Sequence, residues 1–353
     1  MIRPETSGAA AMLYRHRRRA EPTDPMRKPR PIFYRRRPTV HTRIKTWTLA
    51  AVAAFAVVTA FACLGGTWWV FDLFAHFRVQ YVMVAVVLGA VALGLGRRDL
   101  LAAVMLLAAP HVWQISPMMD LSALRPAEAS NDRAIRVATF NAQWRNRQPQ
   151  AVVNWVRASA PDILLLQEVG PNWRSQFDRL ADILPHHVPA SRGDGTALHL
   201  FSRHPIGNVR VETPVGLRFP ILTAEVDIDG VVTNVAGVHA PAPTSAWLSR
   251  RRNDYLGAVA AWARGTEGPA VALGDFNTSP WSNHFHDLGD RSGLADAAAG
   301  KGWQPTWPSW MQLAGVPIDH VLVSRHIRAS AVSTGPDLGS DHLPLIAELI
   351  VNR

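Results

Sequence analysis

The sequence is short of cysteine and of charge. Its single cysteine, Cys63, excludes an intramolecular disulfide and any zinc site built from cysteine side chains. Charged residues make up 18% of the 353 residues, compared with about 25% in soluble domains, and hydrophobic residues make up 48%. This shortage of charge indicates that part of the chain lies in a membrane, and the length leaves room beside it for one domain of about 220 residues.

The excess of positive charge is confined to the start of the chain. Residues 1–45 contain 13 Arg and Lys residues and three acidic residues, whereas residues 130–353 contain 20 of each sign. We predict a disordered basic tail over 1–45. The favoured interpretation is a cytoplasmic anchor beside a membrane span, and the alternative is a nucleic-acid-binding segment. The neutral remainder argues against a catalytic surface that coats long nucleic acids.

Three apolar runs follow the tail and predict three transmembrane helices, over about 46–68, 79–96 and 100–115. The first run is long enough to cross a hydrocarbon core of about 30 Å, and the third is the shortest. The basic tail and the pair Arg97 and Arg98 both favour the cytoplasmic side. We therefore expect a multi-pass protein of the cell membrane with residues 134–353 outside the cytoplasm. If the third run does not cross, that domain is inside.

After a predicted polar linker over 116–133, short β-branched runs alternate with helical segments, which is typical of an α/β fold. Strands are predicted over 134–140, 163–167, 198–202, 221–228, 231–239, 269–274, 318–323 and 343–349. Helices are predicted over 150–159, 172–184 and 246–264. The region 134–353 is therefore expected to be one α/β domain.

Polar side chains recur where these strands begin or end, which is where ligands gather in α/β sheets. They are Asn141, Glu168, His239, Asp275, Asn277, Asp319, Asp341 and His342. Asn141, Glu168 and Asp341 offer the hard oxygen donors that Mg²⁺ prefers. A carboxylate such as Asp275 can accept a proton from water, and Asp319 can orient and charge His342. These groups suit metal-assisted hydrolysis at phosphorus.

Six short motifs stand in one order along the chain: Thr-Phe-Asn (139–141), Leu-Leu-Gln-Glu (165–168), Val-His-Ala (238–240), Gly-Asp-Phe-Asn (274–277), Ile-Asp-His-Val-Leu (318–322) and Ser-Asp-His-Leu-Pro (340–344). Each motif is weak alone, but the ordered set over 134–350 resembles the endonuclease/exonuclease/phosphatase superfamily, the DNase I-like proteins. The resemblance implies a four-layer α/β sandwich of two β-sheets flanked by helices. The predicted spans look like those of the membrane-anchored bacterial branch that includes teicoplanin-resistance proteins.

The same resemblance implies a role for each site residue. Glu168 would bind Mg²⁺, or alternatively Mn²⁺, with Asn141 and Asp341 nearby. Asp275 would orient or deprotonate the attacking water, and Asn277 would contact the phosphate. His342 would contact the scissile phosphate, tuned by Asp319, and His239 would lie near the phosphate or the leaving group.

These expectations lead to a first hypothesis of a membrane-anchored phosphohydrolase that acts on a lipid-linked phosphate or pyrophosphate. The alternatives are a nuclease or phospholipid phosphodiesterase with the same site, and a non-catalytic membrane-binding module. Two groups of residues stay open at this point. Arg250, Arg251 and Arg252 fit either an anion site or a solvated helix face. Trp303, Trp307 and Trp310 fit either a lipid or sugar pocket or the core.

Overall fold

The computed structural model describes residues 39–119, 133–170, 173–190, 196–214 and 216–351. Most of the predicted basic tail and most of the predicted linker lie outside these residues. From Ile44 onward the described residues belong to one compact unit. The first helix begins at Val40, within the range predicted as tail, and a helical turn, η1 (Ser116–Met119), occupies the start of the predicted linker.

Within residues 39–119, four α-helices precede the sheets: α1 (Val40–Cys63), α2 (Trp69–Ala75), α3 (Arg78–Gly94) and α4 (Arg98–Ile115). The helical segments Val40–Cys63 and Arg98–Met119 are each long and apolar enough to cross a membrane. The second predicted span differs from the prediction, because α2 and α3 meet the same test only as a pair bent by 63°. The described chain thus has two candidate spans, or three if the bent pair is one span.

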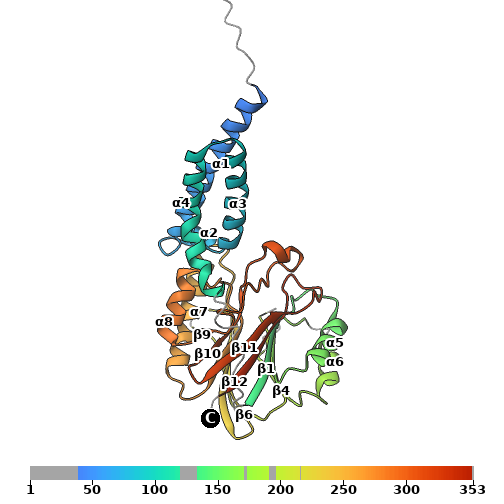
Figure 1. Ribbon diagram of the computed structural model, residues 1–353. Helices are drawn as coiled ribbons and strands as arrows, with labels where there is room; N and C mark the ends of the chain where they lie inside the picture. The colour runs from blue at the N-terminus through green and yellow to red at the C-terminus, as the bar shows by residue number, and fades with distance from the viewer. Residues whose placement is uncertain (1–38, 120–132, 171–172, 191–195, 215, 352–353) are drawn as a thin grey trace, which may run out of the picture. The chain divides into compact units, whose positions relative to one another are not determined.

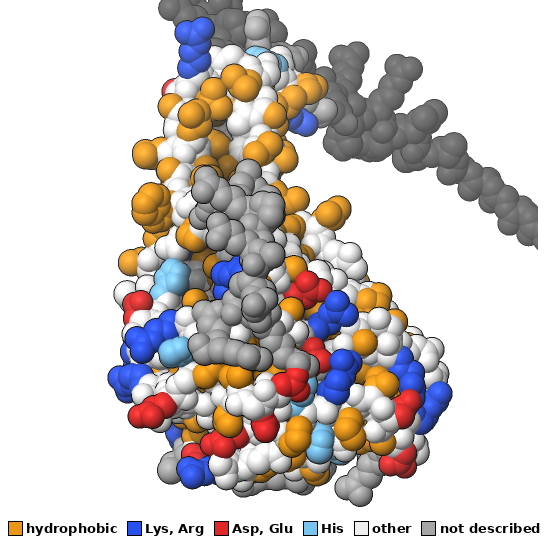
Figure 2. All heavy atoms as spheres, turned by 60° about the horizontal axis from the view of Figure 1, so that its bottom comes forward, with side chains coloured by type: hydrophobic (Ala, Val, Ile, Leu, Met, Phe, Trp, Pro, Cys, Tyr) orange, Lys and Arg blue, Asp and Glu red, His pale blue; other side chains and the backbone are white. Residues whose placement is uncertain are grey.

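The helical region has an apolar surface, as expected for helices in lipid. Val86, Leu106 and Trp113 are 67%, 75% and 77% exposed, and Figure 2 shows hydrophobic side chains covering this region while charged side chains gather over the sheets. Inside, the buried Arg78 donates hydrogen bonds to the carbonyl oxygen of Ala62 (2.5 Å) and to His111 Nδ1 (3.1 Å). The start of α3 is therefore held against the end of α1, so that α3 returns beside it.

Two mixed six-stranded sheets form the rest of the unit. The first runs in the order β11 (Ile327–Thr334), β12 (Leu345–Val351), β1 (Arg133–Asn141), β2 (Ile163–Gln167), β4 (Leu198–Ser202), β3 (His186–Ala190). The second runs in the order β5 (Ile206–Glu212), β6 (Ile221–Ile228), β7 (Val231–His239), β8 (Ala270–Asp275), β10 (Asp319–Val323), β9 (Ala295–Asp296). Each sheet has one parallel pair, β1 with β2 and β7 with β8, and the other pairs are antiparallel.

The alternation of side chains along the strands builds four layers, which confirms the expected sandwich (Figure 1). Val137 and Leu165 of the first sheet share one core between the sheets with Val235 and Val271 of the second. The outer faces are covered by helices, namely α5 (Pro149–Ser159) and α6 (Arg174–Phe177) on the first sheet, and α7 (Ala246–Arg264) and α8 (Asn283–Ser292) on the second. The interior is apolar, so polar site residues can gather only at the strand ends.

The predicted secondary structure departs from the structure where burial is low or segments are short. The helix predicted over 172–184 is, in its described part, α6 followed by the 3₁₀ turn η4 (Asp178–Leu180). The strands β3, β5, β9 and β11 and the helix α8 were not predicted. The strand β5 is almost entirely exposed, so its sequence lacks the apolar alternation that marks a half-buried strand.

Candidate active site

The strand register gathers the predicted site residues at one end of the sandwich. Asn141 pairs with Gln167 across the parallel strands β1 and β2, which places Glu168 one residue further along. In the other sheet, Asp275 pairs with both His239 and Asp319. The two sheets face each other at this end, so the polar ends of both parallel pairs meet over the shared core.

Local backbone geometry explains the glycine of the Gly-Asp-Phe-Asn motif. Gly274 has φ +140°, and a Cβ on it would lie 1.9 Å from the carbonyl oxygen of Val238. Only glycine allows β7 and β8 to approach this closely. Glu168 and Asn277 also have left-handed backbones, with φ of 51° and 49°, although neither is a glycine. Such backbones are uncommon and concentrate at functional sites.

One side of the site pairs a carboxylate with a histidine from the opposite sheet. Glu168 Oε1 lies 3.3 Å from His239 Nε2 and accepts a hydrogen bond of 3.1 Å from Asn141 Nδ2. The same Asn141 amide donates to Asp275 Oδ2 at 3.1 Å, so it bridges the two carboxylates. Burial alone would raise the pKa of Glu168, but the hydrogen bond and charge of His239 outweigh burial and hold that pKa at about 2.

The other side of the site is a buried histidine between two carboxylates. His342 Nδ1 donates to Asp319 Oδ2 at 2.8 Å, and His342 Nε2 lies 3.9 Å from Asp275 Oδ2. Burial would lower the pKa of His342, but the adjacent Asp319 outweighs burial and raises that pKa to about 10. Burial, reinforced by the charge of Asp319, raises the pKa of Asp275 to about 6. This side therefore combines a protonated imidazole with a carboxylate that titrates near neutrality.

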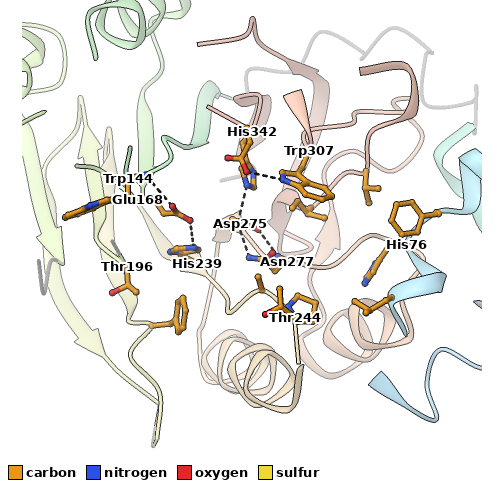
Figure 3. Close-up of a pocket in the computed structure, with 18 residues that line it drawn as sticks. His76, Trp144, Glu168, Thr196, His239, Thr244, Asp275, Asn277, Trp307 and His342 are labelled. Atoms are coloured by element: carbon orange, nitrogen blue, oxygen red, sulfur yellow. Dashed lines mark hydrogen bonds and ion pairs between the residues drawn. The ribbon is translucent and has the colours of Figure 1, made fainter. Parts of the chain in front are cut away.

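Asn277 and Asp341 complete the set. The Asn277 amide nitrogen Nδ2 donates to Asp275 Oδ2 (3.1 Å) and to the carbonyl oxygen of Ala240 (2.8 Å), so its orientation is fixed. The Asp341 carboxylate accepts a hydrogen bond from Trp307 Nε1 at 3.3 Å. Figure 3 shows His239, Glu168, Asp275, Asn277 and His342 pointing into the same cavity.

This cavity has a volume of about 1030 Å³ and two chemically different parts. Six of the eight predicted site residues line it, while Asn141 and Asp319 are buried beneath. The remaining wall is largely apolar and includes Leu73, Phe77, Phe219, Val316 and Ile318. Leu73 and Phe77 come from α2 and from the residue before α3, which sequence reasoning assigned only to the membrane region. Only the fold brings them here, and no motif marks them.

The donor set fits a hard divalent cation. Asn141 brings the carboxylates of Glu168 and Asp275 together, and the buried Asp319 Oδ1 has no hydrogen-bond partner among the described residues. Asp275, Asp319 and His342, which the sequence assigned to catalysis, also present ligand atoms within 4.8 Å of one another. Oxygen-rich donors of this kind suit Mg²⁺ or Mn²⁺. The assignment of Asn141, Glu168 and Asp341 as the ligands stays a prediction.

The sequence left open the roles of three arginines, 250–252, and of three tryptophans. The members of each group differ in their surroundings. Arg250 is exposed and Arg251 lies over the Trp247 ring, with 5.4 Å between the guanidinium carbon and the ring centroid. Arg252 is fully buried and fits neither an anion site nor a solvated face. Among the tryptophans, Trp307 lines the cavity and Trp310 is 74% exposed.

Comparisons with known proteins agree with this architecture. The model of the Endonuclease/Exonuclease/phosphatase family matches residues 138–342, more than half of the chain. No curated protein matches the sequence.

Solved structures resemble the sandwich at low sequence identity. A humanized TDP2 of D. rerio has a TM-score of 0.53 at 14% identity, covering 61% of this chain and 98% of its own. TDP2 of Caenorhabditis elegans has a TM-score of 0.52 at 16% identity, covering 62% and 98%. The mannosyl-6-phosphatase Bt3783 of Bacteroides thetaiotaomicron has a TM-score of 0.50 at 18% identity, covering 61% and 99%. At these identities the likeness shows the fold alone.

Proposed function

The chain belongs to the Endonuclease/Exonuclease/phosphatase family, whose members act on phosphodiester or phosphoester bonds, and from this membership we propose a narrower function. The protein is a membrane-anchored, Mg²⁺-dependent phosphohydrolase that cleaves a phosphoester or pyrophosphate bond of a lipid-linked substrate. A polyprenyl pyrophosphate is the specific candidate. The mannosyl-6-phosphatase name of one structural neighbour is compatible with phosphomonoester hydrolysis on this fold.

The observation that carries this proposal is the composition of the cavity. Its polar end is formed by Asp275, Asn277 and His342, and its apolar wall includes Leu73 and Phe77, which lie between candidate membrane spans. A phosphate on a hydrocarbon chain needs both environments at once, because the charged head requires polar partners and the chain requires apolar ones. A long, water-exposed polyanion needs no such wall.

An exposed apolar loop beside the cavity supports a substrate that comes from the bilayer. The helical turn η5 (Ser309–Ala314) carries Trp310 and Leu313, which are 74% and 81% exposed. Gln80, near the start of α3, donates hydrogen bonds to the carbonyl oxygens of Ala314 (2.8 Å) and Gly315 (2.7 Å). The loop is thus fixed to the start of α3, close to the bend between α2 and α3. Its exposed tryptophan is of the kind that gathers at membrane–water interfaces.

The direction of the helices supports a catalytic domain outside the cytoplasm. The basic tail and Arg97 with Arg98 favour the cytoplasmic side. Because Arg78 holds the start of α3 against the end of α1, α3 carries the chain back if α1 and α4 both cross. The sandwich then follows α4 on the side opposite to the tail.

Each residue of the site has its own role in the proposed hydrolysis. Asp275, whose pKa is raised toward neutrality, is suited to accept a proton from the attacking water. The protonated His342 is suited to stabilise the charge that develops on the phosphoryl oxygens. Asn277 fixes the orientation of the Asp275 carboxylate, to which both its backbone nitrogen and its side-chain amide donate. Glu168, with Asn141 and Asp341, would hold the cation, which supplies Lewis-acid activation of the phosphoryl group when bound. His239 is oriented by Glu168 toward the same cavity.

The test uses the full-length protein in detergent with Mg²⁺, on polyprenyl pyrophosphate and on supercoiled plasmid in parallel. We expect release of inorganic phosphate from the lipid, lost in Asp275→Ala, and an intact plasmid. Nicking of the plasmid without phosphate release would instead assign the site to a nuclease. If Asp275→Ala is as active as the unaltered protein on both substrates, a catalytic role for this site is rejected.

A further inference from the structure

A buried ion pair joins α2 to α7, one of the two described helices that cover the second sheet. Asp72 of α2 and Arg252 of α7 are both fully buried, and Arg252 Nη2 lies 2.5 Å from Asp72 Oδ2. The other oxygen of Asp72 accepts a hydrogen bond of 2.9 Å from the Ser282 hydroxyl. Two charges are removed from water only where each finds a close partner, so this contact fixes α2 on the sandwich.

The same guanidinium reaches the active site. Arg252 Nη1 donates a hydrogen bond of 3.1 Å to the backbone carbonyl oxygen of Asn277. Asn277 has a left-handed backbone with φ +49°, and both its backbone nitrogen and its side-chain amide donate to the carboxylate of Asp275. For a residue other than glycine this conformation is unfavourable unless its surroundings stabilise it. The hydrogen bond from Arg252 helps to stabilise this conformation of Asn277 from below the cavity.

The segment after Asn277 is tied to the end of α2 by two further contacts. His76 Nδ1 is hydrogen-bonded to the hydroxyl of Ser279 at 2.9 Å, and Trp281 Nε1 donates to the carbonyl oxygen of His76 at 2.9 Å. Ser279, Trp281 and Ser282 are almost completely buried. The loop that carries Asn277 is therefore held at several points by a segment that lies between candidate membrane spans.

We propose that Arg252 and Asp72 are positioning residues for Asn277, so that the active site is complete only when α2 is docked on the sandwich. Asp72 neutralises and orients the guanidinium, and the guanidinium in turn fixes the carbonyl group of Asn277. The proposal rests on the catalytic site proposed above but not on a lipid substrate. Its physical basis is that a planar guanidinium holds two acceptors in a fixed geometry, whereas the donors of a Lys ammonium group rotate and fix neither acceptor.

Arg252→Lys is the decisive variant because it keeps the charge beside Asp72 and gives up the second, fixed contact. The full-length protein in detergent is assayed with Mg²⁺ on the soluble diester bis(p-nitrophenyl) phosphate. We expect kcat to fall about 10-fold or more with KM within about threefold of the unaltered protein, because the loss lies in transition-state stabilisation. Hydrogen exchange of the peptide covering residues 275–282 should become faster.

Asp72→Asn provides an independent variant, and Asp287→Asn is the matched control. Asp287 forms an exposed ion pair with Arg291 on α8, so its loss should change neither kcat nor exchange. The double variant Asp72→Asn with Arg252→Lys should lose little more than the single variants, because both act through one contact.

Several outcomes separate this proposal from its alternatives. If both variants fold and keep kcat and exchange at 275–282 unchanged, the proposal is overturned. If Asp72→Asn fails to fold, Arg252→Lys decides, and an unchanged kcat there would show a purely structural tether. If the protein cleaves the soluble diester but no lipid-linked substrate, the lipid assignment fails while the positioning role still stands on the kcat and exchange results. If the diester is not cleaved, hydrogen exchange alone decides.

Discussion

The two histidine–carboxylate pairs of the active site look alike in sequence and differ in the structure. Asp319 and His342 are both almost fully buried and lie 2.8 Å apart. Glu168 and His239 are 3.3 Å apart, and the Glu168 side chain keeps 28% of its surface exposed. Its exposure therefore leaves Glu168 accessible to a cation or a substrate. The buried Asp319 instead pairs with His342 and stabilises the protonated form of that imidazole.

The difference teaches how one cavity can keep opposite charges in place. The pKa of Glu168 is about 2, so this group is anionic, and the pKa of His342 is about 10, so this group is cationic at neutral pH. Asp275 lies between the two pairs, linked to Glu168 through Asn141 and facing His342. The anionic side suits a metal, and the cationic side suits a phosphoryl oxygen.

The largest expected effect comes from Asp275, which both sides share. Asp275→Asn should lower kcat about 10³-fold, since it removes the proposed base and one anionic oxygen. It should not lower Tm, because burial, reinforced by the charge of Asp319, disfavours the Asp275 carboxylate. Asp254→Asn, at an exposed position of α7, is the control. A kcat within tenfold of the unaltered protein would remove Asp275 from the mechanism.

A smaller effect, confined to the cationic side, is expected from Asp319→Asn. His342 should lose its raised pKa, so kcat/KM should fall about 10²-fold near pH 8, and its alkaline limb should move to lower pH. A raised histidine pKa stabilises the fold fully below its unfolded value of 6.5 and loses that contribution as pH rises through about 10. The Tm difference from the unaltered protein should therefore shrink between these pH values. A pH-independent Tm difference would contradict the ion pair.

The smallest effect is expected on the anionic side, where Glu168→Gln keeps the shape and removes the charge. The Mg²⁺ concentration for half-maximal activity should rise about 10-fold or more, and saturating Mg²⁺ should restore part of kcat. Titration of activity and of Tm with Mg²⁺ measures both effects. If the midpoint does not move, Glu168 is not a ligand of the cation.

Much of the fold followed from apolar patterning. The strands predicted over 198–202, 221–228 and 231–239 and the helix predicted over 246–264 coincide with the observed elements, because each is bounded by clear turn or capping residues. The exposed edge strand β5 and the helix α8 escaped prediction, because neither carries a long apolar run. Just before the second predicted span, over 79–96, the polar Asp72 and Arg78 accompany a bend between α2 and α3 that the hydropathy of 79–96 did not indicate.

The sequence by itself determined which residue types stand at the strand ends, from Asn141 to His342, because β-strand periodicity and the ordered motifs are local properties of the chain. It also determined that residues 1–45 are basic and that apolar runs follow them. Tertiary structure alone decided that Leu73 and Phe77 of the helical region form a wall of the cavity, and that Arg252 is buried against Asp72 rather than exposed beside Arg250. These contacts join residues about 180 positions apart, and their energies depend on burial and pairing, which no local pattern encodes.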